Sequence, residues 1–318
     1  MNWVKEKLVP ILAGSTGVGK TELSIILTDH LNSEIVSADS RQIYKYMNIG
    51  TAKPPRPILE KTQHHFIDML EPDKRYSAGQ YGLDARNVIR DIFKKSRTPL
   101  VVGGSGLYIK ALTEGFFRGD VHDSPIRRKL MNKLQKEGTG ALFNDLMKID
   151  PDSAVDIHPN NGKRIIRALE VYLASGEKLS ELQRRKVPQP DFRFIKFGLT
   201  MDRNKLYERI NLRVDKMFEL GLIEEVKAIL EKGYPENLNS LNSVGYKEVI
   251  QYLNGESDLE TCVSEVKKNS RRYAKRQLTW FRADADIQWY TVDPEHPISE
   301  IASKIHGKYR EASMQNVY

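Results

Sequence analysis

A loop that could bind a diphosphate or a triphosphate lies near the start of the chain. Residues 14–21 read G-S-T-G-V-G-K-T, which matches the phosphate-binding pattern G-x-x-x-x-G-K-[ST]. We predict that all of its members bind the phosphoryl groups: Gly14, Ser15, Thr16, Gly17, Val18, Gly19, Lys20 and Thr21. Glycines let the backbone N–H groups turn inward around an anion, Lys20 supplies a point charge, and the Thr21 hydroxyl can bind Mg²⁺. The loop therefore predicts phosphate chemistry supported by magnesium.

A carboxylate follows the next apolar segment. Asp39 comes eighteen residues after Thr21, directly after residues 34–38. If 34–38 is a strand of the same parallel sheet, Asp39 lies at the edge of the sheet where ligands gather. There it could act as a general base or hold magnesium. The alternative is a turn cap, a common role for an Asp followed by Ser.

A third apolar segment, residues 99–102, is followed by Gly103 and Gly104 and not by an acidic residue. Energy-coupling NTPases usually place an Asp after such a strand to hold Mg²⁺. A small-molecule kinase or a transferase therefore fits the sequence better than a motor-type ATPase. The two glycines could also be only a tight turn between a strand and a helix.

Basic residues are concentrated in three places. Arg209 and Arg213 share one face of a helix, where they could clamp phosphate oxygens or simply be solvated. Lys163, Arg164 and Arg167 share another helix. Seven cations lie within sixteen residues near the C-terminus: Lys267, Lys268, Arg271, Arg272, Lys275, Arg276 and Arg282. With a net charge of +8, this density favours a polyanionic partner over a merely solvated helix face.

Composition limits the remaining possibilities. Of 318 residues, 40% are apolar and 29% charged, which is typical of a folded globular chain. The single cysteine, Cys262, excludes a disulfide framework and a Cys/His zinc module. Adjacent His64 and His65 would point to opposite faces of a strand, so we expect a structural role for them. No apolar run is long enough to span a membrane and the first residues lack a signal peptide, so we expect a cytoplasmic protein.

The order of elements predicts the fold class. We expect strands at 8–13, 34–38, 99–102 and 192–200, and helices at 20–31, 77–96, 161–175, 203–220, 222–231 and 258–281. Alternation of this kind indicates an α/β fold, a P-loop-type parallel sheet flanked by helices. The strand signal disappears between about 116 and 190, and residues 184–190 read as a linker. We therefore predict a catalytic core formed by 1–115 and 191–318, with a small helical domain inserted at 116–190.

Several motifs together resemble those of one family. They are the phosphate loop, D-S-R-Q-I-Y at 39–44, G-T-A-K-P at 50–54, H-H-F-I-D at 64–68, G-G-S-G-L-Y at 103–108, R-I-I-R-A-L-E-V at 164–171, Arg209-Ile210 with Arg213, V-G-Y at 244–246 and A-K-R-Q at 274–277. In this order, over residues 8–285, the chain resembles the bacterial tRNA dimethylallyltransferases, also called tRNA isopentenyltransferases. It departs from their pattern at Ser105, where Thr is usual, at Asn161, where Asp is common, and inside the phosphate loop.

The resemblance implies an activity and a set of site residues. It implies transfer of a dimethylallyl group from dimethylallyl diphosphate to N6 of adenosine 37, beside the anticodon of tRNA, with release of pyrophosphate. Asp39 would accept the N6 proton, while Lys20, Thr21 and Arg213 would hold the diphosphate together with Mg²⁺. The residues expected to contact tRNA are Asp39, Ser40, Arg41, Gln42, Ser105, Lys163, Arg164, Arg167, Lys275, Arg276 and Gln277. The inserted domain would grip the anticodon stem-loop.

Two alternatives remain at this point. A nucleoside or small-metabolite kinase shares the loop and the acidic residue, but it has no use for the basic C-terminal helix. An RNA-binding NTPase or a non-catalytic RNA module would explain the basic helix, but not the glycines after 99–102 or an intact Asp39. Nothing in the sequence resembles a coiled-coil seam, so we expect a monomer.

Overall fold

The computed structural model describes residues 7–116, 123–185 and 187–314. The first six residues, where we expected no signal peptide, and position 186 of the predicted linker lie outside this range. The chain divides into two compact units. The first comprises Met1–Tyr76, Tyr81–Thr113 and Pro190–Tyr318, and the second comprises Ser77–Gln80 and Glu114–Gln189.

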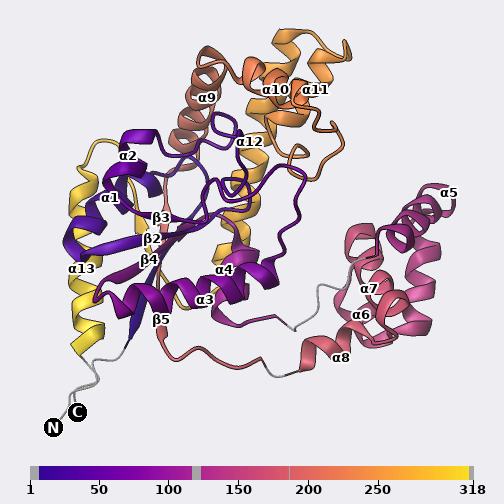
Figure 1. Cartoon of the computed structure of the whole chain (residues 1–318), viewed down its shortest axis with the longest axis horizontal. Helices are drawn as coiled ribbons and strands as arrows, with labels where there is room; N and C mark the ends of the chain where they lie inside the picture. Colours follow the sequence, from indigo (N-terminus) through magenta and orange to yellow (C-terminus); the bar gives the residue numbers. More distant parts are fainter. Residues whose placement is uncertain (1–6, 117–122, 186, 315–318) are drawn as a thin grey trace. The chain divides into compact units, whose positions relative to one another are not determined.

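The first unit is built on a six-stranded sheet (Figure 1). Its strands are β1 (Leu8–Gly14), β2 (Ser33–Ala38), β3 (His64–His65), β4 (Thr98–Gly103), β5 (Arg193–Thr200) and β6 (Ile287–Thr291). They lie in the order β3-β2-β4-β1-β5-β6, and each neighbouring pair is parallel. Every residue of β1 and β2 is buried, as expected of central strands covered on both faces. The predicted α/β fold class is confirmed.

Helices accompany this sheet, and side chains from several of them form the apolar core that anchors the phosphate loop. They are α1 (Lys20–Leu31), α2 (Arg56–Lys61), α3 (Ala78–Lys94), α4 (Gly106–Thr113), α9 (Arg203–Glu219), α10 (Leu222–Glu231), α11 (Tyr246–Leu253), α12 (Leu259–Arg282) and α13 (Ile298–Met314). One apolar cluster joins Leu12 of β1, Leu23 of α1, Ile210 of α9 and Ala274 of α12. Val18 belongs to the same cluster, so the loop is anchored in the core by its own apolar residue.

In its described residues, the second unit contains four helices: α5 (Ser124–Ile149), α6 (Pro151–Asp156), α7 (Gly162–Ser175) and α8 (Leu179–Arg184). Gly138, with a φ of 80°, breaks α5 into two helical parts. The prediction for α7 is confirmed at both ends, because Asn161 accepts a hydrogen bond from the Arg164 N–H and Gly176 ends the helix in a left-handed conformation. The unit has its own apolar core, which includes Leu142 and Ile165.

Some elements of the first unit differ from the expectation. The sequence pattern predicts neither the short β3 nor β6, which extends the sheet beside β5. The structural role expected for the histidines is confirmed: His65 Nε2 lies 2.7 Å from Glu34 Oε2, and His64 Nδ1 lies 2.7 Å from the Thr62 carbonyl oxygen. Within the described ranges, no group of three or more His, Cys, Asp or Glu could hold a metal. Among those residues, too, no helix is long and apolar enough to cross a membrane.

Candidate active site

Three strand ends meet where the sequence predicts the site. Because β4 lies between β1 and β2, the phosphate loop after β1 and Asp39 after β2 flank the turn after β4. The Ser105 N–H donates to the Ala38 carbonyl oxygen at 3.0 Å. A Cβ on Gly103 would lie only 2.1 Å from that same oxygen, so only glycine fits there. The turn after β4 thereby fixes the backbone that carries Asp39.

The phosphate loop has the conformation that its glycines allow. Gly17 and Gly19 have φ angles of 81° and 106°, in the left-handed region that other residues rarely adopt. The Lys20 ammonium folds back over the loop and donates to the carbonyl oxygens of Gly14 at 2.9 Å and Ser15 at 2.7 Å. Lys20 is therefore held at the centre of the loop.

Two buried cations face this loop. Burial lowers the pKa of Lys20 to about 8, with Asp39 acting in the opposite direction and Arg213 lowering it further. Arg213 of α9 donates to the Thr16 hydroxyl at 3.2 Å, and burial lowers its pKa as well, against the influence of Asp39. Among the described residues, no carboxylate lies within salt-bridge distance of either cation. Such a site is suited to an anionic ligand.

Asp39 has the turn-capping role that the sequence analysis gave as the alternative, and its role as a base or magnesium ligand stays a prediction. Its Oδ1 accepts the backbone N–H of Arg41 at 2.8 Å and of Gln42 at 3.3 Å, which is a turn cap. Within the described part of the chain, no hydrogen bond involves its Oδ2. The same residue influences the pKa of Lys20 and of Arg213, so its charge lies close to both. One carboxylate oxygen caps the turn while the other is available for chemistry.

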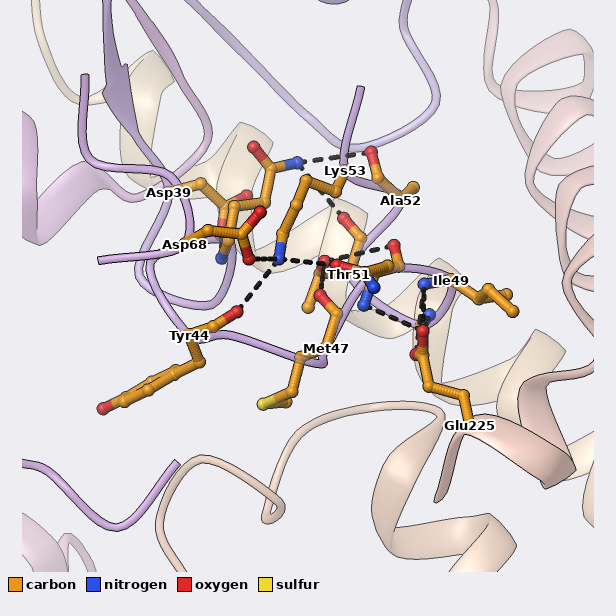
Figure 2. Close-up of polar contacts among 12 residues, drawn as sticks. Asp39, Tyr44, Met47, Ile49, Thr51, Ala52, Lys53, Asp68 and Glu225 are labelled. Carbon is orange, nitrogen blue, oxygen red and sulfur yellow. Dashed lines mark hydrogen bonds and ion pairs between the residues drawn. The ribbon is translucent and has the colours of Figure 1, made fainter. Parts of the chain in front are cut away.

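The residues after Asp39 form hydrogen bonds with backbone carbonyl groups elsewhere in the first unit. Arg41 donates to the Asn239 carbonyl oxygen at 2.7 Å. Gln42 Nε2 donates to the carbonyl oxygens of Thr51 at 3.2 Å and Ala52 at 3.3 Å (Figure 2). Ser40 and Ser105 are both half-buried. This predicted tRNA-contacting segment is thus a well-anchored loop.

Gln277, a predicted tRNA contact, is buried beside the phosphate loop. Its side chain is buried, with Oε1 accepting the Thr16 N–H at 2.8 Å and Nε2 donating to the Gly104 carbonyl oxygen at 2.9 Å. A Cβ on Gly104 would lie 2.3 Å from that Nε2. The amide oxygen and the amide nitrogen of Gln277 both form hydrogen bonds inside the protein. The structure therefore gives no exposed amide group for the expected contact of Gln277 with tRNA. Gln277 instead braces the phosphate loop against the turn after β4.

The basic residues of α12 differ in their surroundings, and Arg271 donates to Asn211 Oδ1 at 2.6 Å. Lys267 pairs with Asp215 at 2.6 Å, and Lys268 pairs with Glu265 at 2.7 Å. Four others are exposed: Arg272, Lys275, Arg276 and Arg282. Positions 272, 275, 276 and 282 recur at helical spacing, so these cations share one face of the helix.

The basic residues of α7, in the second unit, are also divided. Lys163 and Arg164 are exposed. Arg167 lies 3.5 Å from Glu170, a fully buried carboxylate that also accepts a hydrogen bond from Arg127 at 2.9 Å. Arg167 therefore serves the packing of the second unit, whereas Lys163 and Arg164 are open to a partner.

A second buried lysine, Lys53, holds together a cluster that the sequence pattern did not reveal. Lys53 donates to the Tyr44 carbonyl oxygen at 2.9 Å, to Asn48 Oδ1 at 2.9 Å and to Asp68 (Figure 2). Burial lowers its pKa, and Asp68 opposes that shift. Lys53 and Asp68 belong to two of the motifs that resemble the family, G-T-A-K-P at 50–54 and H-H-F-I-D at 64–68, but their spacing in the sequence does not show that the two side chains pair.

Hard oxygen ligands suited to magnesium lie beside the loop. Thr21 is exposed at the start of α1, and Asp39 presents a carboxylate oxygen. Mg²⁺ prefers a few such oxygens and completes its shell with water and substrate phosphates. The residues present therefore fit a metal that is shared with a bound diphosphate.

Comparisons with known proteins agree with this geometry. The model of the IPP transferase family matches residues 42–284. A tRNA dimethylallyltransferase of Natranaerobius thermophilus is 46% identical over 307 residues, which is 96% of this chain and 92% of that protein. One from Thermotoga maritima is 44% identical, covering 93% of this chain and 96% of the relative.

Solved structures show the same likeness. The tRNA isopentenylpyrophosphate transferase of Bacillus halodurans is 41% identical, with a TM-score of 0.72 over 99% of this chain and 100% of that chain. A eukaryotic dimethylallyltransferase acting on tRNA is 29% identical, with a TM-score of 0.77 over 96% of this chain and 80% of its own. The matching family model spans more than half of the sequence, and the chain belongs to the IPP transferase family.

Proposed function

We propose that this protein transfers a dimethylallyl group from dimethylallyl diphosphate to N6 of adenosine 37 of tRNA. The bond between C1 of the donor and its diphosphate oxygen breaks, and the electron pair leaves with pyrophosphate. A bond forms between C1 and N6, and the N6 proton passes to Asp39. The names of the relatives and the anion-binding loop both support this reaction.

The observation that carries the proposal is a pair of buried cations that have no carboxylate partner among the described residues. Lys20 and Arg213 face the loop, and the backbone N–H groups of the left-handed loop add to their field. Charge that develops on the leaving diphosphate is stabilised most strongly by such fixed groups in a dry site. Mg²⁺, held by Thr21 and the diphosphate, would share that charge.

Asp39 supplies the second requirement, a base for a weak nucleophile. An exocyclic adenine amine needs a positioned proton acceptor, which contributes about 10²–10⁴-fold to the rate. Because Oδ1 is used in the turn, we assign the proton to Oδ2 of Asp39. A base stacked in the anticodon loop cannot reach this group, so adenosine 37 must be flipped out of its stack.

The tRNA would be held by exposed cations of both units. On the first unit these are Arg272, Lys275, Arg276 and Arg282 of α12, and on the second they are Lys163 and Arg164 of α7. We propose that the helical insertion, residues 116–190, contacts the anticodon stem-loop. Ser40, Arg41, Gln42 and Ser105 would contact the loop bases next to the flipped adenosine.

The experiment that tests the proposal uses radiolabelled dimethylallyl diphosphate, Mg²⁺ and an unmodified tRNA with adenosines after its anticodon. We expect label in the RNA at adenosine 37 and stoichiometric release of pyrophosphate. Absence of label, combined with ATP-dependent phosphorylation of a nucleoside or another metabolite, would replace the transferase with the kinase alternative.

Asp39→Asn separates the two roles of this residue. The amide oxygen still caps the turn at Arg41 and Gln42, but the side chain no longer accepts a proton. We expect the single-turnover rate to fall about 10²–10⁴-fold while tRNA affinity stays within a factor of about two. A variant that keeps wild-type turnover would remove Asp39 from the mechanism. Asp39→Ala, which also loses the cap, should additionally weaken tRNA binding.

A further inference from the structure

One carboxylate accepts hydrogen bonds from the backbone of three consecutive residues, 48–50. Glu225 of α10 accepts the N–H groups of Asn48 at 2.9 Å, Ile49 at 2.8 Å and Gly50 at 3.2 Å (Figure 2). It also accepts the Tyr246 hydroxyl at 2.6 Å. Three consecutive N–H groups that converge on one anion form a nest, and here the anion belongs to the protein itself.

The backbone around residues 48–50, from Tyr46 to Ala52, depends on contacts with other elements to keep its conformation. Tyr46 and Ala52 have φ angles of 68° and 48°, and a left-handed conformation costs a residue with a side chain about 1–2 kcal/mol. Gly50 is packed so closely on Tyr246 that an added Cβ would lie 2.4 Å from the ring. The conformation of the segment is therefore imposed by its contacts with α10 and α11 and not by its own backbone preference.

Hydrogen bonds, joined by a short stretch of backbone at residues 50–52, lead from Glu225 to the proposed base. Glu225 holds residues 48–50, and the adjoining carbonyl oxygens of Thr51 and Ala52 accept both bonds from Gln42 Nε2. The Gln42 N–H in turn donates to Asp39 Oδ1. Each step joins neighbouring groups of the first unit, so a displacement at Glu225 is transmitted to the turn that orients Asp39.

We propose that Glu225, assisted by Tyr246, is a positioning residue for the acceptor side of the reaction. It touches neither substrate, and it acts by holding the segment that carries Gln42 and thereby Asp39. This inference rests on the proposed function, since the reaction is its main readout. It assigns no role to Glu225 in binding the diphosphate, because the described contacts of Glu225 do not include the phosphate loop.

The chain offers a matched pair of variants. Tyr246→Phe removes a phenol–carboxylate hydrogen bond of 2.6 Å to Glu225, and Tyr234→Phe removes one of 2.6 Å to Glu71. Both substitutions conserve shape, but only the first lies on the path to Asp39. We expect Tyr246→Phe to lower kcat about tenfold and to raise KM for tRNA, because small misplacements of reacting groups are costly. Tyr234→Phe should keep kcat and KM within about twofold of wild type.

Two further measurements separate positioning from a general loss of stability. Pyrophosphate affinity of the Tyr246→Phe protein should equal that of wild type, because the phosphate loop is untouched. In Glu225→Gln, hydrogen exchange at the amides of residues 48–50 should accelerate, while that at β1 stays unchanged.

Equal kinetic constants for the two tyrosine variants, or unchanged exchange at 48–50 in Glu225→Gln, would overturn the positioning role. Failure of the wild-type protein to label tRNA would instead overturn the proposed function. The exchange measurement does not depend on activity, so the two failures are distinguishable.

Discussion

Two lysines of the first unit are buried, and they differ in their counter-charge. Lys53 donates to two oxygens of the loop at 44–48 and pairs with Asp68. In the described part of the chain, Lys20 donates to the carbonyl oxygens of its own loop and to no carboxylate, and it has Arg213 nearby. A buried cation without a paired anion is costly to a folded protein. The difference indicates that Lys53 completes a structural cluster, and it supports the proposal that an anionic ligand completes the site of Lys20.

Replacing Lys20 tests the functional half of this comparison and has the largest expected effect. In Lys20→Met the buried apolar stem is kept but the charge that faces the diphosphate is lost. We expect the single-turnover transfer rate to fall by at least about 10²-fold and pyrophosphate binding to weaken strongly. Thermal unfolding of the ligand-free variant should show no large loss of stability. Near-normal turnover would contradict the assignment of Lys20 to the leaving group.

The pH dependence of pyrophosphate binding sharpens the same comparison. Burial lowers the pKa of Lys20 to about 8, so the free protein loses this charge as the pH rises through that value. Only the protonated form attracts the anion, and affinity should therefore decline above pH 8, by up to about tenfold per pH unit. Calorimetric titration between pH 7 and 9.5 measures this decline. The Lys20→Met protein is the control, and its profile should be flatter over this range.

Replacing Lys53 tests the structural half. Lys53→Met removes the donor shared by the Tyr44 carbonyl oxygen, Asn48 and Asp68. We expect a loss of about 1–3 kcal/mol in the free energy of unfolding, from groups left without their partner. Pyrophosphate affinity should remain at the wild-type value, since these groups lie outside the phosphate loop. Denaturant unfolding and calorimetry measure the two quantities, and a selective loss of pyrophosphate binding would contradict the division of roles.

Exposed cations form a third class, with the smallest expected effect. Lys275 of α12 is exposed, whereas Lys268 of the same helix pairs with Glu265 at 2.7 Å. Lys275→Ala should weaken tRNA binding a few-fold and reduce the dependence of log affinity on log salt by about one. Lys268→Ala is the matched control and should change this slope less. Identical slopes for both variants would argue against the exposed face of α12 as an RNA-binding surface.

The elements that surround the phosphate loop were predictable because their signals are local. The helix at Lys20–Leu31 follows directly from its loop, and α7 is delimited by a side-chain cap at Asn161 and by Gly176. The position of Asp39 followed from one topological rule, the gathering of parallel strand ends. By contrast, β6 is a short edge strand whose pairing with β5 depends on residues just over ninety positions away. No local periodicity reveals such a partner.

The residues that anchor the loops of the candidate site could not be predicted either, because their partners also lie far away in the sequence. Glu225 is 177 residues from Asn48, and Gln277 is 261 residues from Thr16. Their residue types are ordinary for exposed helix positions, and only the folded backbone shows which groups they reach. Arg167 illustrates the converse, because a charge run on a helix does not reveal that one of its members pairs with the buried Glu170.

The bracing of the phosphate loop by Gln277 limits how this protein can be dissected. The same helix exposes cations on one face and, on another, inserts an amide between Thr16 and Gly104. Helix α12 is therefore part of the core that supports the phosphate loop. A truncated fragment that ends before α12 would lose this support together with the basic surface. Attempts to isolate a minimal diphosphate-binding domain should retain the chain through that helix.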